Sequence, residues 1–152
     1  MIELCVEHDQ WQQDVQNIAG LLQECLQALW QILPDKQHRP ISVLLTDDSK
    51  MKELNQSYRN KPTATNVLSF SAMDCAGAPL GDIAMGFQTC KRETVEQDIS
   101  LADHLCHLFV HGVLHLYGFD HQTHELAKQM EALETKILLI AGRRDPWQSA
   151  IL

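Results

Sequence analysis

Three histidines in the last third of the chain have the residue type and the spacing of a metal site. His111 and His115 lie four residues apart in a helical segment, about 40° apart around the helix and about 6 Å apart along it. On an unbroken helix His121 would lie about 15 Å from His111, too far to share an ion. Gly118 can adopt a left-handed conformation, end the helix and fold the chain back. The spacing therefore predicts that His111, His115 and His121 bind one metal ion.

The three predicted ligands also indicate which metal is bound and what it does. Neutral imidazoles suit zinc, with nickel, copper and iron as further options. Three protein ligands leave one coordination position open, whereas structural zinc sites are usually closed by four. A zinc ion with an open position lowers the pKa of a bound water to about 7 and polarises a phosphoryl or carbonyl oxygen. We therefore expect one zinc ion per chain and a metal-dependent hydrolase.

The position after the first histidine disfavours one class of hydrolase. Zinc proteases with the pattern HExxHxxGxxH share this histidine spacing, and their glutamate after the first histidine is the general base. Position 112 is glycine here, and a glycine has no side chain to act as a base. A protease that works by this mechanism is therefore disfavoured.

Other polar residues near the histidines are candidates for supporting roles. Asp120 precedes His121 and either orients a ligand histidine through a hydrogen bond or bonds only to nearby backbone. His104 and His107 fall near the helix face that carries His111. They are either supporting groups and proton carriers or partly exposed helix histidines. Of the two, His107 is the candidate retained for a supporting role.

Four segments of the chain resemble one known family. They are HLFVHGVLHLYGFDH at 107–121, LNQSYRNKPTATNVLSF at 54–70, LGDIAMG at 80–86 and MEALETKILLIAG at 130–142. Taken in their order along the chain, they resemble the bacterial YbeY family, endoribonucleases that act as rRNA maturation factors. The resemblance covers about residues 40–145.

The resemblance implies a single-strand-specific, metal-dependent endoribonuclease of ribosomal RNA processing, notably small-subunit rRNA 3′-end maturation, and of ribosome quality control. It implies zinc on His111, His115 and His121, Arg59 beside the metal, and partners among single-stranded RNA, rRNA and ribosomal or small-subunit assembly proteins. Arg59 also has a physical rationale, since a guanidinium is always charged and grips phosphate through two bonds. Lys61 is a further candidate for RNA contact.

The sequence leaves the mechanism and two other functions open. Either a metal-bound water or the substrate's 2′-hydroxyl attacks phosphorus, and only the second route leaves a cyclic phosphate. One alternative function is metal-dependent hydrolysis of another bond, such as a peptide or small ester. The other is a noncatalytic ribosome-assembly factor with a structural metal.

The hydrophobic pattern predicts the elements that position these residues. It indicates an α+β fold in which a small four-stranded mixed sheet packs against about five helices, in the order βαβαββααα. The predicted strands are 2–7, 41–47, 68–72 and 80–86, the last two forming an antiparallel hairpin. The predicted helices are 13–33, one capped by Asp48 or Ser49, 88–98, 100–117 and one from Thr123 to Gly142. The last has an apolar stripe of Leu126, Met130, Leu133, Ile137 and Ile140.

Length and composition set the broad class. The chain has 152 residues, of which 45% are hydrophobic, and these values predict one domain over 1–152 with a tail at 143–152. The sequence contains no run of about 18 consecutive apolar residues, so we expect no membrane span. Acidic residues lie near the N-terminus, where a secretory signal has basic ones. The five cysteines form no CxxC pair, which favours reduced thiols and a cytoplasmic location. A net charge of −8 means that RNA binding needs a local basic patch.

Overall fold

The computed structural model describes residues 1–72 and 78–147. The strands are β1 (Ile2–Val6), β2 (Ile41–Thr46), β3 (Val67–Ser71) and β4 (Gly81–Gly86). The helices are α1 (Gln10–Asp14), α2 (Ile18–Ile32), α3 (Asp48–Arg59), α4 (Phe87–Gln97), α5 (Leu101–Leu116) and α6 (His124–Ile140). The predicted α+β class is confirmed, and each predicted strand lies within one residue of the observed strand at either end.

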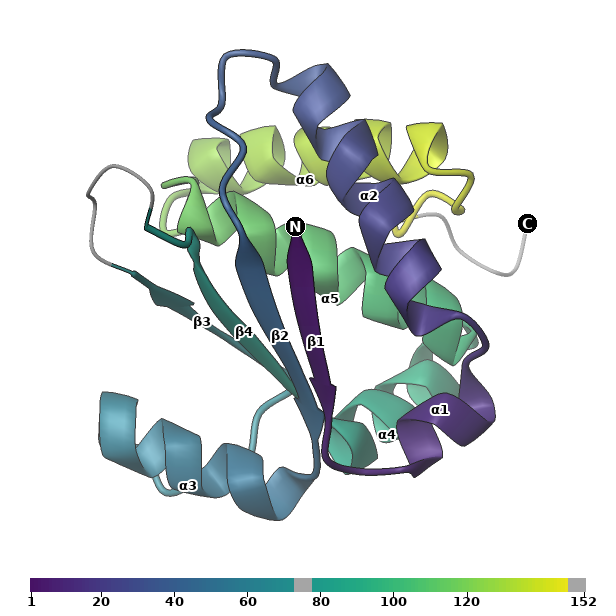
Figure 1. The fold of residues 1–152 in the computed structure, drawn as a ribbon, viewed down its shortest axis with the longest axis vertical. Helices are drawn as coiled ribbons and strands as arrows, with labels where there is room; N and C mark the ends of the chain where they lie inside the picture. Colours follow the sequence, from purple (N-terminus) through teal and green to yellow (C-terminus); the bar gives the residue numbers. More distant parts are fainter. Residues whose placement is uncertain (73–77, 148–152) are drawn as a thin grey trace.

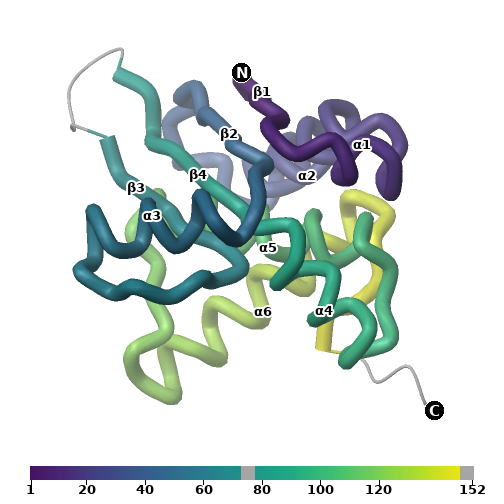
Figure 2. The backbone as a smooth tube through the Cα atoms, turned by 90° about the horizontal axis from the view of Figure 1, so that it is seen from below, coloured from purple at the N-terminus to yellow at the C-terminus, as the bar shows by residue number. Residues whose placement is uncertain are grey.

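The four strands form one mixed sheet in the order β1-β2-β4-β3. β2 pairs in parallel with β1 and with β4, whereas β3 pairs antiparallel to β4 at the edge. The predicted hairpin of β3 and β4 is therefore confirmed. Figures 1 and 2 show α5 running across one face of this sheet, with α2 beside it, and α3 near the opposite face.

Alternation along the strands gives the sheet two different faces. Ile41, Val43 and Leu45 of β2 are buried in the main core, which α2, α5 and α6 complete. On the opposite face, Leu68 and Ala84 pack with Met51 of α3 in a smaller cluster. In β3, Val67 and Ser69 consequently lie on the α5 side of the sheet.

The predicted helix over 13–33 is two helices. Val15 is extended and Asn17 has a φ of 53°, so the chain turns between α1 and α2. This break lets Trp11 enter the core, where it is fully buried and its indole N–H donates to the Thr46 carbonyl at 2.9 Å. Burial of the indole ring outweighs helix continuity here, and it raises the helix count of the described residues to six.

The cap of α3 lies one residue before the predicted positions, Asp48 or Ser49. Asp47 is the N-cap, and its carboxylate accepts from the Lys50 backbone N–H at 2.9 Å. The Asp48 side chain instead bonds across to α4, where its two oxygens accept from the backbone N–H and the hydroxyl of Thr89 at 3.0 and 2.8 Å.

The buried face of α6 is rotated from the predicted stripe. Met130 and Ile137 are buried as predicted, but Leu126 and Ile140 are 37% and 46% exposed. Glu134 takes a buried position among them, with 1% of its surface exposed. The stripe prediction counted apolar residues only and was therefore wrong at both ends of α6, because a carboxylate occupies the inward face.

Capping interactions at both ends of α5 account for its bounds, which lie within one residue of the predicted helix over 100–117. The Ser100 hydroxyl accepts from the Asp103 N–H at 3.0 Å. Gly118 has a φ of +98°, and the Phe119 N–H bonds back to the Leu114 carbonyl at 3.0 Å, as in a Schellman helix end. The glycine therefore ends the helix and redirects the chain.

Residues 143–147, at the start of the predicted tail, contact the body of the protein. Arg143 forms an ion pair with Asp103 at 2.9 Å, and the Trp147 ring lies edge-on to His107 with centroids 5.1 Å apart. The four described cysteines form no disulfide, and Cys25, Cys90 and Cys106 are buried, whereas Cys5 is exposed. Cys75 lies outside the described residues. No described helix is long and apolar enough to cross a membrane.

A glycine in mid-helix lets α5 approach the sheet closely. A Cβ at Gly112 would lie 3.0 Å from the Ser69 Oγ and 3.1 Å from the Ile83 Cδ1. The Ser69 hydroxyl also donates to the Gly112 carbonyl at 3.3 Å, which joins β3 to α5. A side chain at position 112 therefore requires Ser69, Ile83 or the helix to shift.

Gly112→Val should consequently lower the free energy of unfolding by about 2 kcal/mol, because two branched methyl groups overfill this contact. Urea unfolding of the purified protein measures the change. Ala132→Val, on the exposed side of α6, is the matched control and should cost less than about 1 kcal/mol. Equal stability of Gly112→Val and the unaltered protein would contradict the close packing.

Candidate metal centre

The helix end at Gly118 brings the three histidines together. The Nε2 atoms of His111 and His115 lie 3.1 Å apart, and one ring nitrogen from each of His111, His115 and His121 lies within 4.8 Å of the others. The His121 ring centroid is 5.3 Å from that of His111 and 4.9 Å from that of His115. The convergence expected from the spacing is thus present in the fold.

A buried carboxylate from α6 holds the first histidine from behind. Glu134 Oε2 lies 2.6 Å from the Nδ1 of His111, and its Oε1 lies 2.7 Å from the Nε2 of His107. A carboxylate is an acceptor only, so both rings donate N–H groups to it. His111 therefore carries its proton on Nδ1 and turns the lone pair of Nε2 toward His115.

The second histidine is fixed in the same sense. The ring of His115 hydrogen-bonds to the backbone of Phe119. This contact favours the protonated ring, so the ring is the donor. Its Nε2 faces His111, so the donor is Nδ1 and the lone pair of Nε2 points at the lone pair of His111 Nε2. Two lone pairs 3.1 Å apart repel each other unless a cation lies between them or one ring is protonated. This pairing is the arrangement that a bound metal ion satisfies.

The electrostatics favour neutral ligands beside a charged carboxylate. Burial, with smaller contributions from His111 and His121, lowers the pKa of His115. Burial alone would raise the pKa of Glu134, but the hydrogen bonds from His107 and His111 outweigh it and lower that pKa. Because a metal binds neutral imidazole, both shifts favour metal binding.

The histidines open into a cavity of about 410 Å³ that also contains Arg59. Strand β3 forms its other wall, since Val67, Ser69 and Ser71 alternate toward this side. A second hollow of about 240 Å³ adjoins it, shares Arg59 and Val67, and is lined by Lys61. Arg59 thus lines both hollows, whereas Lys61 lines only the one without the histidines.

The end of α3 places Arg59 at this cavity. Asn60 follows it with a φ of 56°, and its N–H closes the helix on the carbonyls of Asn55 and Gln56. The buried Asn55 side chain donates to the Thr63 carbonyl at 2.9 Å, which ties the following loop to the helix. The loop then enters β3, so Arg59 and β3 face the same space.

Comparisons with known proteins agree with this site. The sequence profile of the family described as "Endoribonuclease YbeY" matches residues 5–142. The chain belongs to this family. A relative from Agrobacterium fabrum named "Endoribonuclease YbeY" is 40% identical and covers 96% of this chain and 94% of its own length. One of the same name from Maricaulis maris is 42% identical, covering 96% and 91%.

A solved structure supports the fold of the YbeY-family chain. The solution structure of a Thermotoga maritima protein matches it with a TM-score of 0.59 over 97% of this chain and 99% of the other. The sequence identity is 22%, so this likeness concerns the fold alone.

The other two predicted supporting residues, His107 and Asp120, have different contacts in the structure. His107 contacts Glu134, which contacts His111, so one carboxylate separates it from the three histidines. Asp120 accepts from the Gln122 backbone N–H at 3.2 Å, which is the local backbone bond given as its alternative role. Sequence reasoning missed Glu134, although a charged residue at helical spacing between Met130 and Ile137 was an available signal.

Glu134→Gln should weaken metal binding about 10- to 100-fold, because an amide cannot accept from both His107 and His111 as a carboxylate does. Competition with a chromophoric chelator measures the affinity. Glu125→Gln, exposed in the first turn of α6, is the matched control and should bind metal as the unaltered protein does. Unchanged affinity in Glu134→Gln would remove this carboxylate from the centre.

Proposed function

We propose that this chain is a zinc-dependent endoribonuclease that cleaves single-stranded RNA, with His111, His115 and His121 as the ligands. Its substrate is ribosomal RNA, at small-subunit 3′-end maturation and in ribosome quality control, with ribosomal or small-subunit assembly proteins as partners in the cytoplasm. The observation that carries the proposal is the pair of opposed Nε2 atoms, 3.1 Å apart, in a cavity that also holds Arg59. The shared name of its relatives supports the same activity.

The donor set fits zinc. Zinc–nitrogen bonds of about 2.0–2.1 Å in a tetrahedral site separate two ligand atoms by about 3.4 Å. The 3.1 Å between His111 and His115 is close to that value. Three ligands beside an open cavity leave room for a reactant, and bound zinc would supply Lewis-acid polarisation of a phosphoryl oxygen. The cavity therefore suits a catalytic ion better than a structural one.

Arg59 supplies a permanent positive charge for the phosphate. A guanidinium holds two phosphate oxygens at once, and charge that develops on them during cleavage is stabilised by a cation already in place. Lys61 in the adjoining hollow gives the RNA a second cationic contact. Arg59 and Lys61 provide local positive charge on a chain whose net charge of −8 opposes binding of RNA over the surface as a whole.

The packing of Gly112 counts against a peptide hydrolase. The position that carries the general base in the HExxH proteases faces Ser69 and Ile83, where even a Cβ would be 3.0 Å from a neighbouring atom. A glutamate there would have to displace Ser69 or Ile83. The alternative of peptide hydrolysis by that mechanism is thus disfavoured by space as well as by composition.

Digestion of a labelled single-stranded RNA by the purified protein, with and without a chelator, tests the function. We expect internal cleavage that the chelator abolishes and added zinc restores, and no cleavage by His115→Ala. A terminal cyclic phosphate on the products would identify attack by the 2′-hydroxyl. A protein that cleaves a peptide but no RNA, or a His115→Ala variant that supports rRNA maturation in cells, would contradict the proposal.

Arg59→Ala should lower the rate of RNA cleavage about 100- to 1,000-fold while zinc content stays at the level of the unaltered protein, because it removes transition-state charge stabilisation and no ligand. Single-turnover cleavage together with elemental analysis measures both quantities. Arg92→Ala, exposed on α4, is the matched control and should cleave normally. Equal loss in the two variants would mean that Arg59 acts only through overall charge.

A further inference from the structure

One residue in the wall of the metal cavity has no role in the site described so far. Asn66 immediately precedes β3 and lines the cavity with Arg59 and the three histidines. Its backbone carbonyl is already occupied, since it accepts from the Gly86 N–H at 3.1 Å and from the Cys90 thiol at 3.6 Å. The side-chain amide is therefore the acceptor that Asn66 can offer to a ligand.

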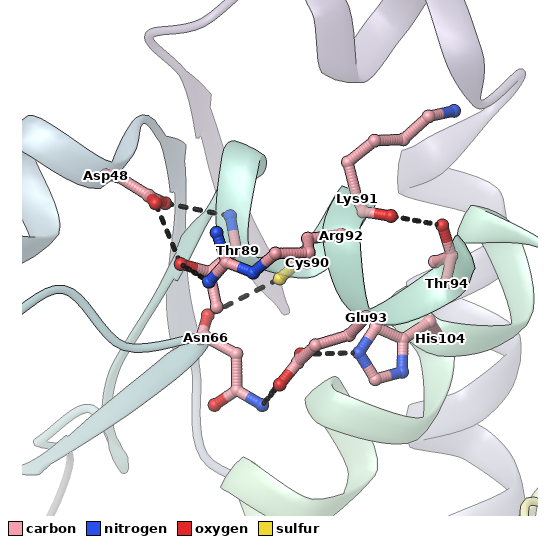
Figure 3. A network of polar contacts seen from close by, with 9 residues as sticks. All are labelled: Asp48, Asn66, Thr89, Cys90, Lys91, Arg92, Glu93, Thr94 and His104. Atoms are coloured by element: carbon pink, nitrogen blue, oxygen red, sulfur yellow. Dashed lines mark hydrogen bonds and ion pairs between the residues drawn. The ribbon is translucent and has the colours of Figure 1, made fainter. Parts of the chain in front are cut away.

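A carboxylate fixes which way this amide faces. The Nδ2 of Asn66 lies 3.1 and 3.2 Å from the two oxygens of Glu93, an acceptor-only group. The reverse orientation would set the amide oxygen against the carboxylate and is repulsive. Figure 3 shows Nδ2 directed at Glu93 and the amide oxygen directed away from it. The amide oxygen of Asn66 consequently stays available as an acceptor on the side away from Glu93.

Glu93 is itself held by a buried histidine. The Nε2 of His104 lies 2.9 Å from Glu93 Oε1, and His104 is 3% exposed. Burial lowers the pKa of His104 and outweighs the opposite effect of Glu93, so the ring is neutral and donates through Nε2. The Nδ1 of this tautomer carries a lone pair rather than a proton, which suits its lack of a partner among the described residues. His104 and Asn66 thus both donate to Glu93, and this pattern fixes the orientation of the Asn66 amide.

We propose that the Asn66 amide oxygen accepts a hydrogen bond from a ribose 2′-hydroxyl, and that Glu93 is the positioning residue that keeps this oxygen turned to the cavity. The inference rests on the proposed function. A phosphate gripped by Arg59 carries its ribose into the same cavity, and the 2′-hydroxyl is a donor that every RNA nucleotide has and DNA lacks. Asn66 therefore favours RNA over DNA independently of base sequence.

The test compares two single-stranded oligonucleotides of one sequence, one with ribose and one with 2′-fluororibose, which lacks the hydroxyl proton. Binding to the zinc-loaded full chain is measured by fluorescence anisotropy in the cold, with a gel to verify intact RNA. We expect a preference for ribose of about threefold to tenfold, the value of one hydrogen bond. Asn66→Ala should bring the ratio close to one without changing the zinc content.

Glu93→Gln separates positioning from a merely structural role. The introduced amide can accept from His104 through its oxygen and donate to Asn66 through its nitrogen, which turns the Asn66 amide round and presents a donor to the cavity. The ratio should then fall although Asn66 is unchanged. Gln56→Ala removes an exposed amide of α3 that bonds only to Asn60 among the contacts described, and should keep the full preference.

The outcomes distinguish this inference from the proposed function. An Asn66→Ala ratio equal to that of the unaltered protein, or a ratio that follows base sequence, would overturn the inference while RNA cleavage stands. An unaltered protein that binds both oligonucleotides equally would also overturn it. A preference that depends on Asn66 in a protein that cleaves no RNA would sustain the inference and contradict the endoribonuclease.

Discussion

The buried carboxylate of Glu134 is the interaction on which the site depends. An isolated charge in a protein interior costs several kcal/mol, and here two imidazole N–H groups at 2.6 and 2.7 Å compensate it. The contact joins α6 to α5 and at the same time decides which nitrogen of His111 is free to bind. The polar bond that holds the helices together therefore also turns the His111 ring toward His115.

The cavity exists because α5 and β3 approach each other closely. Gly112 permits the approach. The hydrogen bond from the Ser69 hydroxyl to the Gly112 carbonyl fixes the position of α5 along β3. The histidines then stand on the last turn of a helix and just beyond it, while Arg59 and Asn66 come from either end of the loop before β3. Each wall thus belongs to an element with its own anchoring contact, which keeps the side chains of the cavity at fixed separations.

The spacing of residues along the chain predicted the features that depend on contacts between near neighbours in sequence. The histidine offsets with Gly118, the strand alternation and the helix starts at Ser100 and Thr123 all reappear in the structure. The break at Asn17 was missed, because it depends on where Trp11 finds a partner 35 residues away. Glu134 and Glu93 were missed for the same reason, since each acts on a histidine or an amide 23 to 27 residues distant.

Anomalous diffraction from crystals of the zinc-loaded chain tests the central claim most directly. The account predicts one peak at the zinc edge, about 2.0–2.1 Å from a ring nitrogen of each of His111, His115 and His121, with the Nδ1 of His111 still bonded to Glu134. A peak elsewhere on the chain, or three rings turned away from a common centre, would contradict it.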